Sequence, residues 1–131
     1  MEQLEQYIKE MGVDVELDEF NLKDVQLKLP ALKHKWVGRL VRHKAELSRL
    51  QDNRDRTIKT LAQEVIDTAT YAVNLQTAMK AAEKHQKIRD IDDKVRENKL
   101  IVEFLEKSER IFSGMSFDIK NITEIMKLET L

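Results

Sequence analysis

The chain has 131 residues, a length that suits one domain, and 36% of them are charged. It holds only three Gly and one Pro, too little turn chemistry for an all-β fold. Long helices with solvated faces are typical of this composition, so the sequence predicts an all-α protein. The absence of Cys excludes disulfides and Cys-ligated metal sites and slightly favours an intracellular home.

The charge is unevenly distributed, although the net charge is only −1. Residues 1–27 carry eight acids and two bases, whereas residues 28–60 carry ten bases and three acids. A block of basic residues in a chain whose net charge is close to zero indicates a polyanionic partner. The acidic N-terminal part could cover this block or bind a basic partner.

The sequence of the N-terminal third predicts short secondary-structure elements. An amphipathic helix is expected over residues 2–11, ending before Gly12. The alternation of "VDVEL", residues 13–17, suggests a short extended segment, on a weak pattern. Asp18 suits the N-cap of a further helix. Pro30 is expected to end or kink that helix, and suits the first position of the next one.

A long apolar stripe begins at Leu32 and recurs at helical spacing. Its members are Leu32, Trp36, Leu40, His43, Leu47, Leu50, Ile58, Leu61, Val65, Ala72 and Met79. The stripe predicts one helix of about 50 residues, a length normal for a coiled coil or oligomer. The highly charged "KHQKIRDIDDK" indicates a turn or linker near residues 84–92.

A second amphipathic pattern fills the C-terminal part, and it leaves an apolar segment at the end most free to dock onto another copy. Ser113, Gly114 and Ser116 are candidate breaks within it. The expected organisation is one structural domain with three segments. These are an acidic segment with short helices (1–30), a long basic amphipathic helix (31–90) and C-terminal helices for oligomerisation (91–131).

Lys and Arg side chains form a line beside the apolar stripe. On a helical wheel Lys35, Arg39, Arg42, Arg49 and Arg56 share one face, along about 32 Å of helix. This line is either a solvated coiled-coil flank or a strip that holds a polyanion. The three acids of the block leave most bases without a local partner, and guanidinium groups suit phosphate, which favours the polyanion.

Nucleic acid bound to this line would be held by its phosphates. Trp36 invites a base-stacking role, but it lies on the apolar stripe and is expected to pack in the core. Binding through phosphates is independent of sequence and strongly dependent on salt.

Catalytic and metal-binding patterns are missing. The chain has no Gly-rich phosphate loop and no Ser–His–acid grouping. His34, His43 and His85 lack the spacing of a helical metal pair; His43 is expected to pack in the stripe and the others to be exposed. No apolar run approaches the ~20 residues of a membrane span. We therefore expect no enzymatic activity, no metal, no cofactor and no membrane partner.

Several stretches resemble the UvsY recombination mediator proteins of T-even-like bacteriophages. They are "DVELDEFNL", "KHKWVGRLVRHKAELSRL", "TIKTL", "LIVEF" and the close "SFDIKNITEIMKLE". The resemblance spans most of the chain, with residues 65–95 the least similar, and it rests on order, spacing and total length.

The resemblance implies a function and an assembly. Proteins of this family load the phage recombinase UvsX onto single-stranded DNA coated by the phage single-strand-binding protein, in the cytoplasm of the infected bacterial host. They bind single-stranded DNA without sequence preference and are not enzymes. With the stripes, this predicts a helical hairpin of long helices that assembles into a ring, a hexamer or heptamer. The expected oligomerisation residues are Ile111, Met115, Phe117, Ile119, Ile122 and Met126.

The family's DNA-binding motif is only partly present. It has Lys followed two positions later by Arg; Lys59 in "IKTLA" takes the Lys place, but Leu61 stands where Arg is expected. Arg54 and Arg56 could supply the missing charge. The candidate DNA-binding residues are therefore Lys35, Arg39, Arg42, Arg49, Arg54, Arg56 and Lys59.

Two other functions remain open. A coiled-coil scaffold or adaptor would have no nucleic-acid role and would not need the basic line. An architectural protein would prefer duplex DNA, but no helix-turn-helix pattern supports it. The acidic residues 14–24 are a candidate surface for protein contacts.

Overall fold

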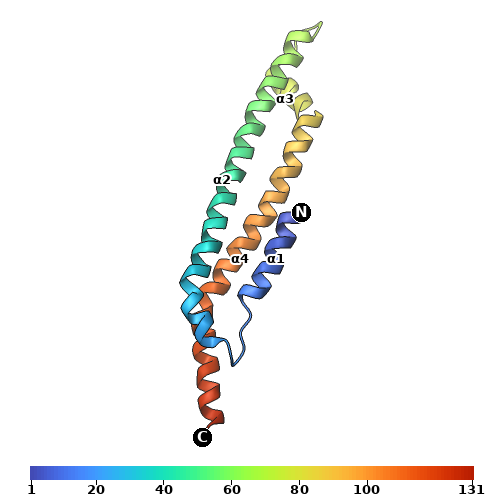
Figure 1. The fold of residues 1–131 in the computed structure, drawn as a ribbon. Helices are drawn as coiled ribbons and strands as arrows, with labels where there is room; N and C mark the ends of the chain where they lie inside the picture. Colours follow the sequence, from blue (N-terminus) through green and yellow to red (C-terminus); the bar gives the residue numbers. More distant parts are fainter. The chain divides into compact units, whose positions relative to one another are not determined.

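The computed structural model describes residues 1–131 and contains four helices and no strand, which confirms the all-α prediction (Figure 1). The helices are α1 (Glu2–Asp14), α2 (Leu22–Thr68), α3 (Leu75–Glu83) and α4 (Gln86–Glu129). The chain divides into two compact units. Unit 1 comprises Met1–Arg42 and Leu100–Leu131, and unit 2 comprises His43–Lys99.

The start of the chain is more helical than predicted. α1 continues through Gly12 to Asp14, so the predicted helix end and the extended segment that follows it are wrong at these positions. Gly12 does not adopt the left-handed conformation that a helix-ending glycine uses. The last turn stays helical because Met11 is buried and the Asp14 carboxylate is hydrogen-bonded to Trp36.

A reciprocal set of hydrogen bonds shapes the turn before α2. Asp18 Oδ1 accepts from the backbone N–H groups of Phe20 (2.7 Å) and Asn21 (2.9 Å). Asn21 Oδ1 in turn accepts from the N–H of Asp18 at 2.9 Å. Asp18 therefore stabilises the turn that leads into α2, and the prediction that it is the N-cap of the helix is wrong, because α2 begins at Leu22.

Pro30 lies inside α2, so the prediction that a helix ends or begins there is wrong. A proline inside a helix removes one backbone hydrogen bond, here the one to the carbonyl of Gln26. Leu29 and Trp36, on either side of Pro30, are 2% and 1% exposed. We infer that this burial outweighs the lost hydrogen bond, and Pro30 itself is exposed.

The long basic helix ends earlier than predicted. α2 stops at Thr68, and a loop connects it to α3, whose first turn is capped by Asn74. Asn74 Oδ1 accepts from the N–H of Thr77 at 2.8 Å. The turn expected near residues 84–92 is found at Lys84–His85. α4 is uninterrupted at Gly114, so no break divides the C-terminal helix.

Each unit has its own core. In unit 2 the small side chains of α3 pack closely on α2 and the start of α4; the buried members are Ile58, Leu61, Ala62, Ala78, Ala82 and Ile88. In unit 1 the core centres on Trp36, which confirms its predicted packing role. The Trp36 ring lies edge-on to Tyr7 and Phe104, with centroids 5.7 and 6.5 Å away, and stacks on Phe112 at 6.3 Å.

Candidate nucleic-acid interface

The structure divides the predicted basic residues into two groups. Lys35, Arg39 and Arg54 are bonded to carboxylates on other helices. Arg42, Arg49, Arg56 and Lys59 are exposed on α2. The second group is exposed to a partner, although Arg49 also pairs with Glu46.

Lys35 and Arg39 are bound by the acidic helix α1. Lys35 Nζ lies 3.1 Å from Glu10 Oε1 and 2.5 Å from Asp14 Oδ2. The Arg39 guanidinium donates to both oxygens of Glu10, at 2.6 and 3.2 Å, a bidentate geometry. The acidic N-terminal part therefore does cover this end of the basic block, one of the two roles that its charge suggested.

These contacts shift the pKa values of the groups involved. The hydrogen bond from Arg39 lowers the pKa of Glu10 below its ordinary value of 4.5, against the opposing effect of burial. Burial alone lowers the pKa of Lys35, but the hydrogen bonds to Asp14 and Glu10 outweigh it and the pKa is raised. Both shifts favour the charged forms of Glu10 and Lys35.

Arg54 belongs to the packing of unit 2. Its Nε lies 2.5 Å from Asp92 Oδ1, and this hydrogen bond raises the pKa of Arg54. Nearby, His43 Nδ1 and the side-chain oxygen of the buried Asn98 are 2.9 Å apart. His43 thus packs within the stripe, as predicted. No group of three or more His, Asp or Glu side chains in the chain could hold a metal ion.

The exposed bases follow a heptad spacing that the sequence reading missed. Arg42, Arg49 and Arg56 recur every seven residues on α2, and Lys59 follows three residues later. Seven residues are about two helical turns, a step of ~10.5 Å, so these side chains stay close to one face of the helix. Arg49 pairs with Glu46 of the same helix, but its side chain is 61% exposed and such pairs are weak. Arg42, Arg56 and Lys59 form no ion pair.

The predicted oligomerisation residues also divide in two. Met115 and Ile119 are only 1% and 8% exposed, because they pack in the core of unit 1. Ile122 and Met126 are half-buried. Ile111 and Phe117 are exposed and therefore remain available to another molecule.

The sequence reading missed two further apolar side chains at the end of α4. Ile125 and Leu128 are 55% and 69% exposed, and Phe117 is 69% exposed. At 100° per residue these three lie within about 80° of each other, opposite the side that carries Met115. The end of α4 is therefore apolar on two faces, and only one of them is covered by the chain.

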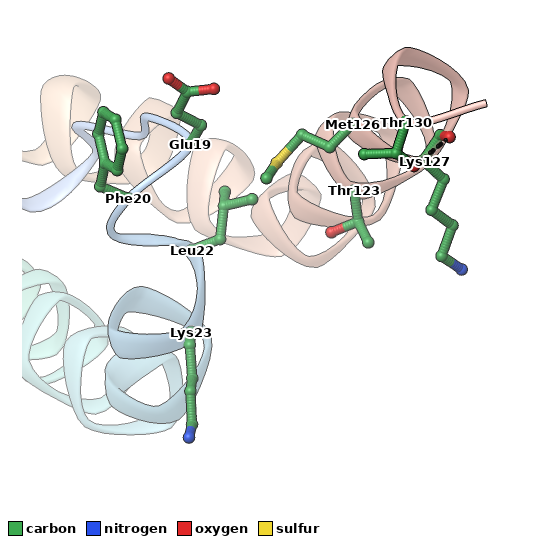
Figure 2. Close-up of a pocket in the computed structure, with 8 residues that line it drawn as sticks. All are labelled: Glu19, Phe20, Leu22, Lys23, Thr123, Met126, Lys127 and Thr130. Atoms are coloured by element: carbon green, nitrogen blue, oxygen red, sulfur yellow. Dashed lines mark hydrogen bonds between the residues drawn. The ribbon is translucent and has the colours of Figure 1, made fainter.

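An open hollow lies beside this region, between the turn before α2 and the end of α4 (Figure 2). Its volume is about 400 Å³, and its residues are Glu19, Phe20, Leu22, Lys23, Thr123, Met126, Lys127 and Thr130. Figure 2 shows the Met126 side chain extending toward Leu22, while Lys23 and Lys127 extend away. Phe20 is 88% exposed at the rim, so the apolar surface continues past α4.

The fold matches solved structures of the bacteriophage T4 recombination mediator protein UvsY. One crystal structure of it, lattice type IV, has a TM-score of 0.81 and 17% identity and covers 96% of this chain and 98% of that chain. Another, lattice type II, has a TM-score of 0.78 and 16% identity, and covers 97% of each chain. At this identity the likeness shows the fold alone. No curated protein matches the chain at significant similarity.

The class of protein follows from the family to which the chain belongs. Residues 10–130 match the family described as "Recombination, repair and ssDNA binding protein UvsY". The chain is thus a protein of the recombination mediator class, with a general role in single-stranded DNA binding. It belongs to the UvsY family, as the resemblance indicated. Members are not known as enzymes, and the family implies single-stranded DNA, a recombinase and a single-strand-binding protein as partners in general. None of the helices is apolar over enough length to span a bilayer.

Proposed function

We propose that this chain binds single-stranded DNA without sequence preference and promotes loading of the phage recombinase onto DNA covered by single-strand-binding protein. It would act in the cytoplasm of the infected bacterial host, with no metal or cofactor. The observation that carries the proposal is the exposed line of Arg42, Arg49 and Arg56 on α2. Guanidinium groups bind phosphate oxygens in bidentate fashion, and such contacts carry no sequence information.

Trp36 does not serve as a base-stacking residue in this proposal. Stacking on bases needs an exposed aromatic ring, whereas Trp36 is 1% exposed and enclosed by other rings. Its indole N–H is also committed, since Nε1 donates to Asp14 Oδ2 at 2.9 Å. The only tryptophan of the chain therefore supports the fold and is not available for base stacking.

The residue that departs from the family's DNA-binding motif is buried. Leu61, which stands where the motif has Arg, is 6% exposed in the core of unit 2. A charged side chain is costly at such a position. Arg56, exposed and three residues before Lys59, is the substitute that we propose for the missing base.

We also propose that the chain assembles into a ring-shaped homo-oligomer, a hexamer or heptamer. The support is the uncovered apolar surface at the end of unit 1, formed by Ile111, Phe117, Ile125 and Leu128. Exposed apolar patches mark interaction sites. A ring would repeat the arginine line in every copy, so avidity would turn weak phosphate contacts into tight binding. A strand bent on such a ring would be drawn away from its coat protein and offered to the recombinase.

The acidic segment suits a contact with a protein partner, and the structure narrows the candidates. Asp14 is bonded within unit 1 and Asp18 is used as a cap. The exposed acids that remain are Glu16, Glu19 and Asp24. We propose these three for the recombinase or the single-strand-binding protein.

The test is fluorescence polarisation with a labelled oligo-dT strand over a salt series, with molar mass by light scattering on the same sample. We expect submicromolar affinity at low salt, a steep loss with salt, and a species of hexamer or heptamer mass. Binding to duplex in preference to oligo-dT would support an architectural protein instead. No binding at low salt would support a coiled-coil scaffold, which the uncovered face of α4 also suits.

A further inference from the structure

We propose that Lys35 and Arg39 form a second, latent phosphate-binding site, which α1 occupies with its own carboxylates until single-stranded DNA displaces them. The inference rests on the proposed DNA-binding function. It adds a site, an internal competitor for that site, and a change in α1 on binding.

The carboxylates of α1 hold these bases as a phosphodiester backbone would. Glu10 spans both bases, since its oxygens lie 2.6 and 3.2 Å from Arg39 nitrogens and 3.1 Å from Lys35 Nζ. Asp14 Oδ2 provides a second anionic oxygen, 2.5 Å from Lys35 Nζ. Carboxylate and phosphate oxygens use the same guanidinium fork, so either ligand fits this pair of bases.

The position of the bases makes them a continuation of the exposed line. Lys35 precedes Arg42 by seven residues, the spacing that separates Arg42 from Arg49 and Arg49 from Arg56. Lys35 and Arg42 both belong to unit 1, so a strand bound at Arg42 meets Lys35 two turns earlier on the same helix. The phosphate that arrives there has to compete with Glu10 and Asp14.

Burial contributes little to holding α1, which is kept on α2 mainly by the contacts of Tyr7, Glu10 and Asp14. Met11 is the only buried residue of this helix, while Ile8 and Val13 are 44% and 70% exposed. The side chains of Glu10 and Lys35 are 39% and 32% exposed, so water and salt screen their ion pair. An isolated helix of this length is marginal in water, and α1 depends on its few contacts with α2 for its order.

The first experiment removes the two internal competitors. Glu10→Gln with Asp14→Asn keeps the shapes of the side chains but removes both negative charges. We expect oligo-dT affinity at low salt to rise about fivefold, because the competing, partly exposed ion pairs of Glu10 and Asp14 are lost. The wild-type protein forms the same two phosphate contacts once α1 is displaced, so the slope of log affinity against log salt should be unchanged.

The control changes the same net charge on the same helix. Glu2 and Glu5 are exposed in the first turn of α1 and do not touch Lys35 or Arg39. Glu2→Gln with Glu5→Gln therefore tests whether loss of negative charge alone improves binding. We expect a change in affinity of less than twofold and an unchanged salt slope.

A third variant tests whether the gain depends on the latent site. Adding Lys35→Gln to the Glu10→Gln, Asp14→Asn protein should remove most of the gain. Trp36, buried beneath α1, reports the displacement directly. We expect its emission to shift to longer wavelength when oligo-dT binds the wild-type protein.

The outcomes separate this inference from the function on which it rests. If the wild-type protein binds oligo-dT but Glu10→Gln, Asp14→Asn binds no more tightly than the control, the latent site is wrong and the DNA-binding proposal stands. If the wild-type protein does not bind at all, both are wrong. Should the double variant lose helical circular dichroism, Glu10→Gln alone decides by the same criterion, because Asp14 then still bonds Trp36.

Discussion

The Arg39 guanidinium lies between the rings of Tyr7 and Trp36, 4.8 and 4.7 Å from their centroids, while its nitrogens bind both carboxylate oxygens of Glu10. Cation–π contacts on two faces and a bidentate ion pair fix this side chain. One of the bases that the sequence assigns to DNA thus joins α1 to the aromatic core of unit 1. Lys35 shares this role, because it bonds Glu10 and Asp14 of α1 and lies over the Trp36 ring, whereas Arg42 and Arg56 are exposed.

Arg39 and Arg56 should therefore respond differently to alanine. Arg39→Ala removes two ring contacts and leaves Glu10 without its main partner, so we expect a loss of about 2 kcal/mol in the free energy of unfolding. Arg56→Ala changes an exposed side chain and should stay within about 0.5 kcal/mol of wild type. Urea denaturation followed by circular dichroism measures both. Equal stabilities of the two variants would show that Arg39 is not structural.

The pKa of Glu10 gives a dependence on pH. Because the folded-state pKa lies below the ordinary value of 4.5, the stabilisation by Glu10 is present above pH 4.5 and is lost as the pH falls through the folded-state pKa. Glu10→Gln should thus be less stable than wild type near neutral pH, by at most about 1 kcal/mol, and the difference should shrink in acid. Urea midpoints of both proteins between pH 7 and pH 3 provide the comparison. A difference that does not change with pH would contradict the assigned ion pair.

Substitutions at Phe117 and Met115 should distinguish an effect on assembly from an effect on folding. Phe117 is 69% exposed, so Phe117→Asp should preserve the helical signal and lower the molar mass seen by light scattering. Met115 is 1% exposed, so Met115→Ala should cost about 2–5 kcal/mol of stability through the cavity that it leaves. An unchanged molar mass for Phe117→Asp would exclude this face from the assembly.

Restoring the family's motif should harm this chain. Leu61→Arg would place a charge among Ile58, Ala62 and the other core residues of unit 2. We expect a loss of at least about 3 kcal/mol and no gain in DNA affinity at temperatures where the variant is folded. Thermal unfolding and oligo-dT titration test the two parts. Tighter binding by a fully stable Leu61→Arg protein would contradict the role that we assign to Leu61.

Much of the fold can be predicted from helical periodicity. The apolar stripe correctly places Trp36, Leu40 and Leu50 in the core, because burial of one helix face imposes that spacing. Pro30 shows the limit of local rules. The backbone hydrogen bond lost at Pro30 is a local effect. The burial of neighbouring residues that compensates for it depends on residues of other helices, which are distant in the sequence.

The candidate site could be predicted only in part, for a related reason. Lys35 and Arg39 lie beside the apolar stripe, and a helical wheel does not show whether a second helix or water covers that border. α1 covers it. The acidic residues of α1 are evident in the sequence, but the sequence does not show which basic residues they contact. Arg42 and Arg56 are exposed, as a place on the solvated side of the stripe predicts.

The most direct test of the central claim compares oligo-dT binding by the wild-type protein and by Arg42→Ala, Arg49→Ala, Arg56→Ala across a salt series. If these exposed arginines hold the phosphates, the variant should keep its helical content and lose affinity at low salt. Its salt slope should be shallower by about 2.1, or ~0.7 for each lost contact in each bound copy. Equal affinity and equal slope for the two proteins would contradict the account and place the DNA on another surface.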